Sequence, residues 1–567
     1  MNKLRLGSRT SRLAMWQTEL VAKKLVGREN KVDIIGIKSS GDLSLGGNLS
    51  DNIGQFVKSV DEKLILGEID IAVHSSKDVP VDHDERISTL AYLERGETSD
   101  IILFSFKAKG SQRLIDVMNS PDSNDLNEVL EAFPKGGRIG TSSVRRQSFF
   151  LSRRDDVIPL AVRGRVETRI RRLLEGRIEA VILAEAGLQR LGALNALPEG
   201  SSDIYAMRIC PNDWPTAPGQ GAIAVHCLTE RLEELGFIRE SLNHFQTESS
   251  VNEERRILRS LGGGCRTPVG VECLNGESCG YMAPENWREQ YSMGNAFDLL
   301  PIDKNGSVSK PEIQTRPTEG ILSNSSSRLI STLNSERMGN KLKNRGIEVV
   351  NVPVIELVAN KQNWPEFSID VSHPRDEWPI MVLTSPFASL CASKMVGHIP
   401  DLAKIQWLAM GPGTARSCFQ NGNPASICAN AGNSKQLENY IKENISVNIK
   451  LLIPRSSAGN ERMVNNLKKF GYSVDSWIGY ENSQKNVKLD GINNDDVLLI
   501  SSPSSARSWD RNELIVPNTV LCMGTTTKTE IQKIERFDNS QLIVLDGSVT
   551  ESVGVWWDEN RGLKNEA

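Results

Sequence analysis

Long apolar runs are absent from this sequence of 567 residues, since no stretch approaches 18 uninterrupted apolar positions. We therefore expect no segment that spans a bilayer. The first sixteen residues hold no apolar run ending in a small-residue cleavage site, so no secretion signal is expected. The nine cysteines are scattered without a regular framework. Because secreted proteins commonly pair their cysteines, this pattern predicts a protein of the reducing cytoplasm.

An excess of charge is also missing. Lys and Arg total 67 and Asp and Glu total 71, for a net charge of −4. This balance argues against nucleic acid or an anionic membrane as the main partner. Histidines number six, and no group of cysteine and histidine has the spacing of a zinc site, so no metal is predicted. We expect a monomer that acts on small molecules.

One loop contains three consecutive glycines followed by a cysteine, in LGGGCRTPVG at 261–270. The preceding SSVNEERRILRSL predicts a helix, because Ser250 and Glu253 have the spacing of a capping box. Cys265 then lies just beyond a helix end, on a turn that its glycines allow to deform. The loop by itself leaves two interpretations open, a half-buried structural thiol and a thiol that approaches a ligand.

Polar residues follow the apolar strand predicted at 69–73, in the run HSSKDVP. Lys77 and Asp78 therefore lie at the end of a strand, where ligands bind in open α/β sheets. A surface ion pair beside a turn is the alternative. His74 is interpreted as a hydrogen-bonded structural histidine. Arg9 and Ser11 lie at an earlier strand-to-helix turn, which is suited to a carboxylate or phosphate.

A second α/β unit begins at Arg138 and is rich in arginine. IGTSSVRRQ predicts a strand, a Gly/Ser turn and a helix, and further arginines follow at later turns and helix starts. The guanidinium fork matches carboxylate geometry, so these positions predict a ligand with several carboxylates. A solvated basic helix face is the alternative, and it accounts for Arg171, Arg172 and Arg177. The residues that remain as ligand candidates at the turns and helix starts of this unit are Ser142, Ser143, Arg145, Arg146, Arg163, Arg165, Arg169 and Arg190.

Six motifs in this order resemble the porphobilinogen deaminase (hydroxymethylbilane synthase) family over residues 3–270. They are HSSKDVP, IGTSSVRRQ, VRGRVETR, AEAGLQRLG, APGQGAIAV and GGGCRTPVG. The resemblance implies two periplasmic-binding-protein-like lobes and a small α+β domain that carries the cysteine. The expected bounds are 1–96 with 208–232 for domain 1, 97–207 for domain 2 and 233–312 for domain 3.

The resemblance also implies site residues and a cofactor. In this family a dipyrromethane, made from two substrate molecules, is attached to a cysteine by a thioether, which makes Cys265 the anchor. Asp78 would be the catalytic carboxylate. The cofactor's carboxylates would be bound by Lys77, Ser143, Arg145, Arg146 and Arg169. Those of the incoming pyrrole would be bound by Arg9, Ser11, Arg163 and Arg190.

The implied chemistry suits these residue types. Loss of ammonia from an aminomethylpyrrole gives a cationic azafulvene, which a nearby carboxylate stabilises. Four such condensations on a tethered chain, followed by hydrolysis, release a linear tetrapyrrole, hydroxymethylbilane. The sequence departs from the family at its lid: LSDNIGQFVKS is short and has no lid lysine.

The composition changes after Asp303, and the stretch from 303 to 320 is rich in Pro, Gly and Ser, which predicts a linker, placed at 313–319. Beyond it a duplicated unit appears: a strand, (T/S)SP and a helix at 384–386 and 501–503, then a strand, G-x-(G/T)-T and a helix at 411–414 and 524–527. Hydroxyl-rich turns that begin helices are anion sites. Simple helix capping is the alternative interpretation of these turns.

This ordered set resembles uroporphyrinogen-III synthase over 320–557. The resemblance implies two α/β lobes with parallel sheets, at 320–355 with 482–560 and at 356–481, and a chain that crosses near 353–357 and returns near 480–484. It implies ring closure with inversion of the last ring and loss of water, assisted by Tyr480. Carboxylates would be bound by Thr384, Ser385, Ser502 and Thr527.

The two resemblances together predict a bifunctional enzyme of haem biosynthesis, which makes hydroxymethylbilane from porphobilinogen and cyclises it to uroporphyrinogen III. Two alternatives remain from the sequence. In one, the second half is a degenerate interaction domain. In the other, the lobes form an anion-binding module without catalysis.

Overall fold

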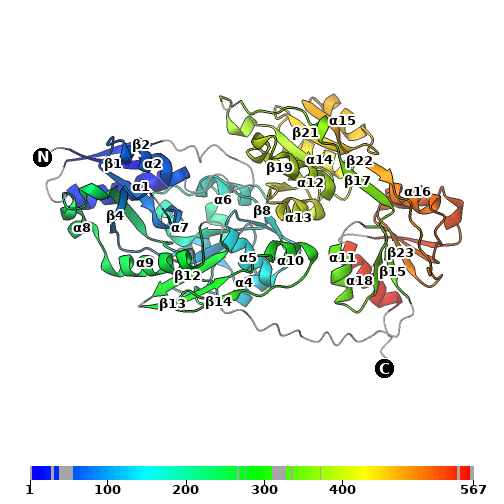
Figure 1. The fold of residues 1–567 in the computed structure, drawn as a ribbon, viewed down its shortest axis with the longest axis horizontal. Helices are drawn as coiled ribbons and strands as arrows, with labels where there is room; N and C mark the ends of the chain where they lie inside the picture. Colours follow the sequence, from blue (N-terminus) through cyan, green and yellow to red (C-terminus); the bar gives the residue numbers. More distant parts are fainter. Residues whose placement is uncertain are drawn as a thin grey trace, which may run out of the picture.

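The computed structural model describes residues 3–26, 31–37, 55–82, 84–264, 267–274, 276–308, 327–333, 336–370, 372–545 and 549–561. Within these ranges the chain forms five β-sheets with helices packed against them (Figure 1). The predicted α/β class is confirmed at this level. The linker predicted at 313–319 and Cys265 lie outside the described residues.

The first sheet brings two strand ends to one edge. Its β1 lies between β2 and β3 and runs parallel to both, whereas β11 is antiparallel to its neighbours β3 and β4. Because β1 and β3 are parallel, Arg9 and the residues after Ser75 share an edge of the sheet. In spatial order the strands are β2 (Val32–Ile37), β1 (Leu4–Arg9), β3 (Ile71–Ser75), β11 (Ile223–Leu228) and β4 (Ile87–Tyr92), with helices α1 (Arg12–Val26), α2 (Gln55–Ile65) and α8 (Gly236–Leu242).

The second sheet contains the arginine-rich unit. At its centre, residues 101–104 of β5 and 180–183 of β9 are continuous buried apolar residues, as expected for strands covered on both faces. The order is β6 (Gln112–Arg113), β10 (Tyr205–Arg208), β5 (Asp100–Phe104), β9 (Ala180–Ala184), β7 (Arg138–Gly140) and β8 (Ile158–Leu160). Its helices are α3 (Leu114–Asn119), α4 (Leu126–Ala132), α5 (Val144–Arg153), α6 (Val166–Leu174) and α7 (Glu185–Ala193).

Two segments, 93–99 and 209–222, connect the first sheet to the second. They lie side by side, and the Gly96 backbone N–H donates to the Gly221 carbonyl at 3.3 Å. Gly221 has φ +85°, and a Cβ there would lie 2.4 Å from the Gly96 oxygen. Only glycine fits this close approach, so the pair fixes where the two connecting segments cross.

The third sheet is small and packs against helix α9 (Phe245–Ser260). It contains β12 (Val269–Leu274), β13 (Glu277–Met282) and β14 (Leu300–Ile302), and α10 (Trp287–Met293) connects β13 to β14 and contacts α5, α11 (Glu336–Lys343) and α13 (Pro412–Gln420). The helix begins earlier than predicted, because the His244 side chain caps it by accepting from the Thr247 N–H. The capping box expected at Ser250 and Glu253 is therefore wrong; Glu253 instead pairs with Arg256.

The second half forms two sheets. The fourth is wholly parallel: β16 (Val349–Asn351), β15 (Leu329–Ser331), β23 (Val497–Ile500), β24 (Thr519–Cys522) and β25 (Gln541–Val544). The fifth is β17 (Ile355–Ala359), β22 (Val474–Gln484), β21 (Leu451–Ser456), β18 (Ile380–Leu383), β19 (Gln406–Ala409) and β20 (Ile427–Cys428). Antiparallel pairing of β17 with β22 occurs at the two predicted crossings.

The predicted duplication is confirmed. Helices α12 (Pro386–Met395) and α16 (Pro503–Arg511) follow the two SP turns, and α13 (Pro412–Gln420) and α17 (Thr525–Ile531) follow the two glycine turns. Proline suits the first helical position because its missing N–H is unpaired there in any helix. The remaining helices are α11 (Glu336–Lys343), α14 (Ser434–Asn444), α15 (Arg462–Phe470) and α18 (Val549–Asn560).

The two halves share a packed interface centred on α13 (Figure 1). Phe419, near the C-terminus of this helix, is fully buried and lies edge-on to Trp287 and Tyr291, with ring centroids 5.6 Å apart in each pair. One hydrophobic cluster contains residues of both the second and the fifth sheet. The halves are therefore joined by a common apolar core as well as by the chain.

Polar contacts surround this interface. The Ala161 N–H donates to the Ala425 carbonyl at 2.9 Å, beside the edge strands β8 and β20, and Arg138 donates to the Cys428 carbonyl at 3.1 Å. Arg416 donates to the Asp156 carbonyl at 2.9 Å, and Lys341 forms an ion pair with the preceding residue, Asp155, at 2.8 Å. Three of these four contacts are accepted by backbone carbonyl oxygens. The interface therefore depends on the backbone conformation of both halves.

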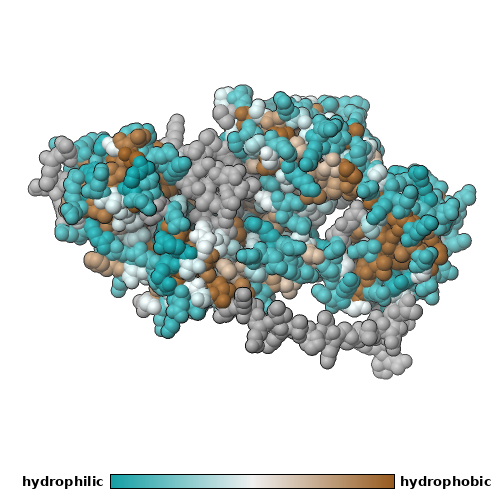
Figure 2. All heavy atoms as spheres, in the orientation of Figure 1, coloured by the Kyte–Doolittle hydropathy of each residue, from teal (hydrophilic) through white to brown (hydrophobic). Residues whose placement is uncertain are grey.

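No helix in the described part of the chain is long and apolar enough to cross a membrane. On the face shown in Figure 2, hydrophilic residues cover most of the described surface, with an apolar patch in the region of the fourth sheet.

Candidate active site

Lys77 and Asp78 lie directly after the buried strand β3, in a short helical turn at Ser76–Asp78. Lys77 is half-buried, whereas Asp78 is exposed. Burial lowers the pKa of Lys77 to about 8, and the neighbouring guanidinium of Arg146 contributes to this. A lysine with this pKa next to a solvent-facing carboxylate is a group that can both bind anions and respond to pH.

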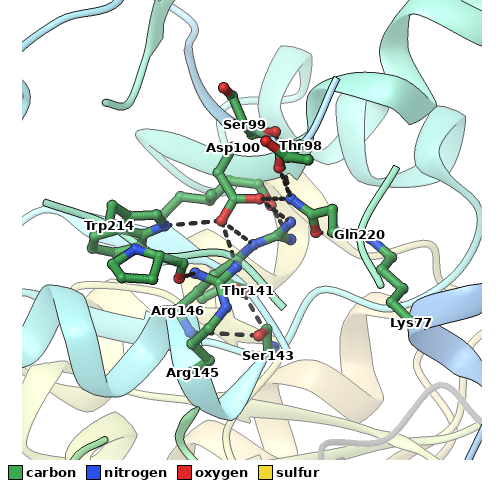
Figure 3. A network of polar contacts seen from close by, with 12 residues as sticks. Lys77, Thr98, Ser99, Asp100, Thr141, Ser143, Arg145, Arg146, Trp214 and Gln220 are labelled. Carbon is green, nitrogen blue, oxygen red and sulfur yellow. Dashed lines mark hydrogen bonds and ion pairs between the residues drawn. The ribbon is translucent and has the colours of Figure 1, made fainter. Parts of the chain in front are cut away.

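Ser143, Arg145 and Arg146 form the start of α5. The Ser143 hydroxyl caps the helix by accepting from the Arg146 N–H at 3.4 Å. Both arginines are buried, and both point their guanidinium groups at Asp100 on β5 (Figure 3). Nη2 of Arg145 lies 2.5 Å from Asp100 Oδ2, and Nη2 of Arg146 lies 2.6 Å from Oδ1.

Asp100 is a central residue that sequence reasoning missed. It is fully buried and also accepts from the indole N–H of Trp214 at 2.9 Å and from the Gln220 amide at 2.8 Å. Desolvation by itself would raise its pKa, but the two arginines outweigh this and hold the pKa far below the usual range. Because Asp100 neutralises one of the two guanidinium charges, the pair adds one net positive charge to the site.

Three further predicted arginines lie beside this group. Desolvation lowers the pKa of Arg163, Arg169 and Arg190 to about 10 each. The charges of Arg146 and Asp78 both act on the pKa of Arg169. The charge of Arg169 in turn contributes to the lowered pKa of Arg163. Within the described ranges, Arg169 and Arg190 form no ion pair; they donate to the carbonyls of Gly164 and Gly221. Half-buried cations of this kind favour an anionic ligand.

The first-sheet residues predicted to bind the incoming pyrrole occupy the expected edge. Arg9 ends β1, and the Ser11 hydroxyl accepts from the Ala14 N–H at 3.3 Å at the start of α1. The structure thus brings Lys77, Asp78, Arg146 and Arg169 within electrostatic reach of one another and Arg163 within reach of Arg169, and it places Arg9 and Ser11 on the same sheet edge as Lys77.

The second half contains a separate hydroxyl-rich site. The Ser385 hydroxyl caps α12 by accepting from the Ala388 N–H at 3.1 Å, and it lies 2.9 Å from the Tyr480 hydroxyl. Tyr480 is 5% exposed, and desolvation raises its pKa. Thr384 immediately precedes this cap, at the end of β18. A buried tyrosine that keeps its proton is suited to donate a hydrogen bond to a leaving hydroxyl.

Ser502 and Thr527 lie at the starts of the helices that follow two strands of the fourth sheet, β23 and β24. The Ser502 hydroxyl caps α16 through the Ser505 N–H at 3.2 Å, and Thr527 is buried in the first turn of α17. No hydrogen bond among the described residues joins this pair to Ser385 or Tyr480. The capping role left open by the sequence is thus confirmed for Ser385 and Ser502.

Ser385→Ala is expected to destabilise α12 by about 1 kcal/mol, the usual value of an N-cap. It also removes a partner of Tyr480, so we expect a reaction that uses the proton of this tyrosine to slow roughly fivefold, the value of one neutral hydrogen bond. The kcat of the second half and hydrogen exchange of α12 would be measured. In a Tyr480→Phe background the same serine change should add no further defect in kcat. An equal further loss in that background would contradict an action through the tyrosine.

Among the described residues, one group could ligate a metal: Asp61, His74 and His226, all buried. Asp61 already accepts from His74 at 2.8 Å and lies 3.6 Å from His226. Hydrogen bonds to the two histidines outweigh desolvation and hold the pKa of Asp61 well below its usual range. His74 is therefore buried and hydrogen-bonded, as predicted.

The fold is that of a multidomain α/β chain with a cluster of half-buried arginines in one half and a group of hydroxyl-bearing residues at helix starts in the other. Residues 4–234 match the family model "Porphobilinogen deaminase, dipyromethane cofactor binding domain", and residues 336–535 match "Uroporphyrinogen-III synthase HemD". The chain belongs to the porphobilinogen deaminase family and carries a uroporphyrinogen-III synthase domain in its second half.

The chain is also similar to individual proteins over part of its length. The porphobilinogen deaminase of Geobacter sulfurreducens is 36% identical over 279 residues, which cover 48% of this chain and 77% of that protein. That of Xanthomonas oryzae pv. oryzae is 32% identical over 342 residues, 59% of this chain and all of that protein. A solved uroporphyrinogen-III synthetase from Helicobacter pylori 26695 aligns with TM-score 0.30 and 12% identity, over 41% of this chain and 99% of that one.

The first half is thus a hydroxymethylbilane synthase domain that binds dipyrromethane, and the chain as a whole acts in haem biosynthesis. The presence of both domains argues against the deaminase-only alternative.

Proposed function

We propose that residues 1–312 condense four porphobilinogen molecules into hydroxymethylbilane with loss of ammonia, at the edge that carries Lys77 and Asp78, and that residues 320–560 cyclise the product. The observation that carries the proposal is the group of half-buried arginines beside Asp78. Arg169 and Arg190 have lowered pKa values and donate to backbone carbonyls, so an anionic ligand would relieve their desolvation. The proposal includes two periplasmic-binding-protein-like lobes, which correspond to the first and second sheets.

The site residues suit a dipyrromethane. Its acetate and propionate groups need several cationic donors around an apolar ring pair, and Lys77, Arg146 and Arg169 lie within electrostatic reach of one another. When bound, this group supplies the nucleophilic pyrrole carbon to which each new ring is added. Cys265 is assigned as its thioether anchor, in the loop between α9 and β12.

Asp78 is assigned as the catalytic carboxylate. It is exposed at the end of β3, and its charge reaches both Lys77 and Arg169. Its carboxylate would lie beside the pyrrole N–H, stabilise the positive charge that develops when ammonia leaves, and move protons between substrate and solvent. Lys77 and the arginines bind carboxylates and orient the ring for this step.

In the second half, Tyr480 is assigned to donate its hydroxyl proton toward the departing hydroxyl of the bilane. Ser385 holds that hydroxyl at 2.9 Å. Thr384, Ser385, Ser502 and Thr527 are assigned as carboxylate-binding groups at helix N-termini, where free N–H groups and the helix dipole favour anions. We further propose that the protein is a cytoplasmic monomer.

Replacement of Cys265 by serine tests the attachment directly. We expect the intact mass of the purified wild-type chain to exceed the apo mass by a few hundred daltons, about the mass of two linked pyrroles. Cys265→Ser should lose this increment together with deaminase turnover, because an alcohol is a poorer nucleophile than a thiolate. The exposed Cys279 provides the control, since Cys279→Ser should keep both. An adduct that survives in Cys265→Ser would overturn the assignment.

A further inference from the structure

Gln220 lies in the second connecting segment and is 1% exposed. Its side-chain amide contacts three different parts of the chain (Figure 3). The amide oxygen accepts from Nζ of Lys77 at 3.2 Å. The amide nitrogen donates to the Thr98 carbonyl at 2.6 Å and to Asp100 Oδ1 at 2.8 Å. A single side chain therefore bridges the first sheet, the first connecting segment and the second sheet.

One end of this bridge is the cationic Lys77, and the other is Asp100, which binds two cationic arginines. Lys77 follows β3 of the first sheet, whereas Asp100 begins β5 of the second sheet and holds Arg145 and Arg146. A change in the spacing of the two sheets at this point must stretch or break one of the hydrogen bonds of Gln220.

The third sheet's helix fixes the backbone of Gln220. Glu254 on α9 accepts from the Gly219 N–H at 2.7 Å and pairs with Arg95 at 2.7 Å. Arg95 in turn donates to the Gln220 carbonyl at 2.9 Å. Both connecting segments are thus attached to the helix that leads into the Cys265 loop.

We propose that Gln220 is a positioning residue of the deaminase site, which holds Lys77 and the Arg145–Asp100–Arg146 set at a fixed separation so that both sheets bind the carboxylates of one ligand. This inference rests on the proposed function, in which Lys77 and Arg146 bind carboxylates. The role follows from the position of Gln220 in the second connecting segment, from which its side chain reaches the first connecting segment and both sheets.

The chemistry of the amide explains why glutamine is needed. The group facing Lys77 must accept a hydrogen bond, and the group facing Asp100 and the Thr98 carbonyl must donate. Glutamate accepts but cannot donate when ionised. Methionine fills a similar volume and does neither well. The two substitutions therefore remove different parts of the bridge.

The ionisation of Lys77 reports on this bridge. Burial lowers the pKa of Lys77 to about 8. A hydrogen bond from the ammonium to the amide oxygen favours the charged form, so its loss lowers the pKa further. A carboxylate at the same position raises it. The charged groups that face Lys77 are Asp78 on its own turn, Asp100 on β5, Arg146 on α5 and Arg169 on α6.

The test is the labelling rate of Lys77 as a function of pH in the full chain, read by peptide mass after brief acetylation. In Gln220→Met we expect the labelling midpoint to fall by about one pH unit, the effect of losing a charge-assisted hydrogen bond. In Gln220→Glu we expect the midpoint to rise above the wild-type value. Because the two substitutions are expected to shift the labelling midpoint in opposite directions, either variant alone tests the proposal if the other folds poorly.

Kinetics supply the second measurement. We expect kcat/KM for porphobilinogen to fall about tenfold at neutral pH in Gln220→Met, with kcat carrying more of the change than KM, because Lys77 positions the tethered dipyrromethane rather than the incoming pyrrole. Gln17, a buried glutamine on α1, provides the matched control. Gln17→Met should alter the melting temperature without moving the Lys77 midpoint.

Unchanged midpoints in both Gln220 variants would overturn the positioning role. Failure of the proposed function would look different, because a wild-type chain without a pyrrolic adduct would still give a Lys77 labelling curve. The labelling result therefore decides the role of Gln220 independently of activity.

Discussion

Replacing Asp78 by asparagine is expected to lower deaminase turnover about 10²–10⁴-fold, the usual contribution of a positioned proton-transfer group. Asparagine keeps the shape of the side chain but has neither the negative charge nor the proton-accepting oxygen. Asp78 is exposed and contributes no apolar packing, so the melting temperature should stay close to that of the wild type. Single-turnover assays of ammonia release would separate the chemical step from product release.

The control for this prediction is a second exposed aspartate on the same connection. Asp82 lies four residues later, with its side chain 91% exposed and a weak 3.6 Å pair to Arg259. Asp82→Asn should leave turnover unchanged. If Asp78→Asn retained more than a small fraction of turnover, the catalytic assignment would have to pass to another group.

Replacing Asp100 by asparagine should destabilise the chain by about 3–5 kcal/mol, the cost of leaving buried charges unpaired. The amide would point an NH₂ group at guanidinium donors that now donate to a carboxylate. Arg145 and Arg146 are 4% and 6% exposed, so water cannot replace the lost partner. The expected readout is loss of hydrogen-exchange protection in α5 at lower urea concentration than in the wild type.

A less buried aspartate gives the comparison. Asp70 pairs with Arg5 and Arg231, whose side chains are 39% and 26% exposed, so Asp70→Asn should cost only about 1 kcal/mol. The pH dependence follows from the sign of the Asp100 shift. Its folded pKa lies far below the unfolded value near 4, so its stabilisation is complete at neutral pH and is lost as the pH falls below about 4. Equal losses for Asp100→Asn and Asp70→Asn would contradict this account.

Local patterns predicted much of the fold. The apolar runs at β18 and β23, each followed by a serine–proline pair, correctly indicated a strand and a helix with a serine cap. The start of α9 was missed because Ser250 and Glu253 have capping-box spacing but lie within the helix, where His244 is the actual cap. Several capping patterns can occur within the sequence of one helix, and the path of the chain before the helix determines which of them forms the actual N-cap.

The candidate site was predicted in part. Arg145 and Arg146 were recognised from their position after a Gly/Ser turn, but their partner Asp100 is 45 residues away and follows no motif. Gln220 belonged to a recognised motif, APGQGAIAV, yet its bridging role depends on two segments that meet only in the folded chain. Long-range pairing of this kind leaves no local periodicity in the sequence.

The interface between the halves was not predicted either. Phe419 is one of the apolar residues expected on a lobe helix, and nothing near it in the sequence indicates Trp287 or Tyr291 as its neighbours. Its burial depends on two helices, α10 and α13, that are more than a hundred residues apart along the chain.

Helix α13 begins at the glycine turn of the cyclising half and ends among aromatic rings of the other half. A lineage that separated the two enzymes into independent polypeptides would uncover Phe419 on one product and its aromatic neighbours on the other. Each separate protein would then need polar residues at these newly exposed positions in order to stay soluble. The fused state is therefore easier to keep than to undo, and the two activities stay in equal number in every molecule.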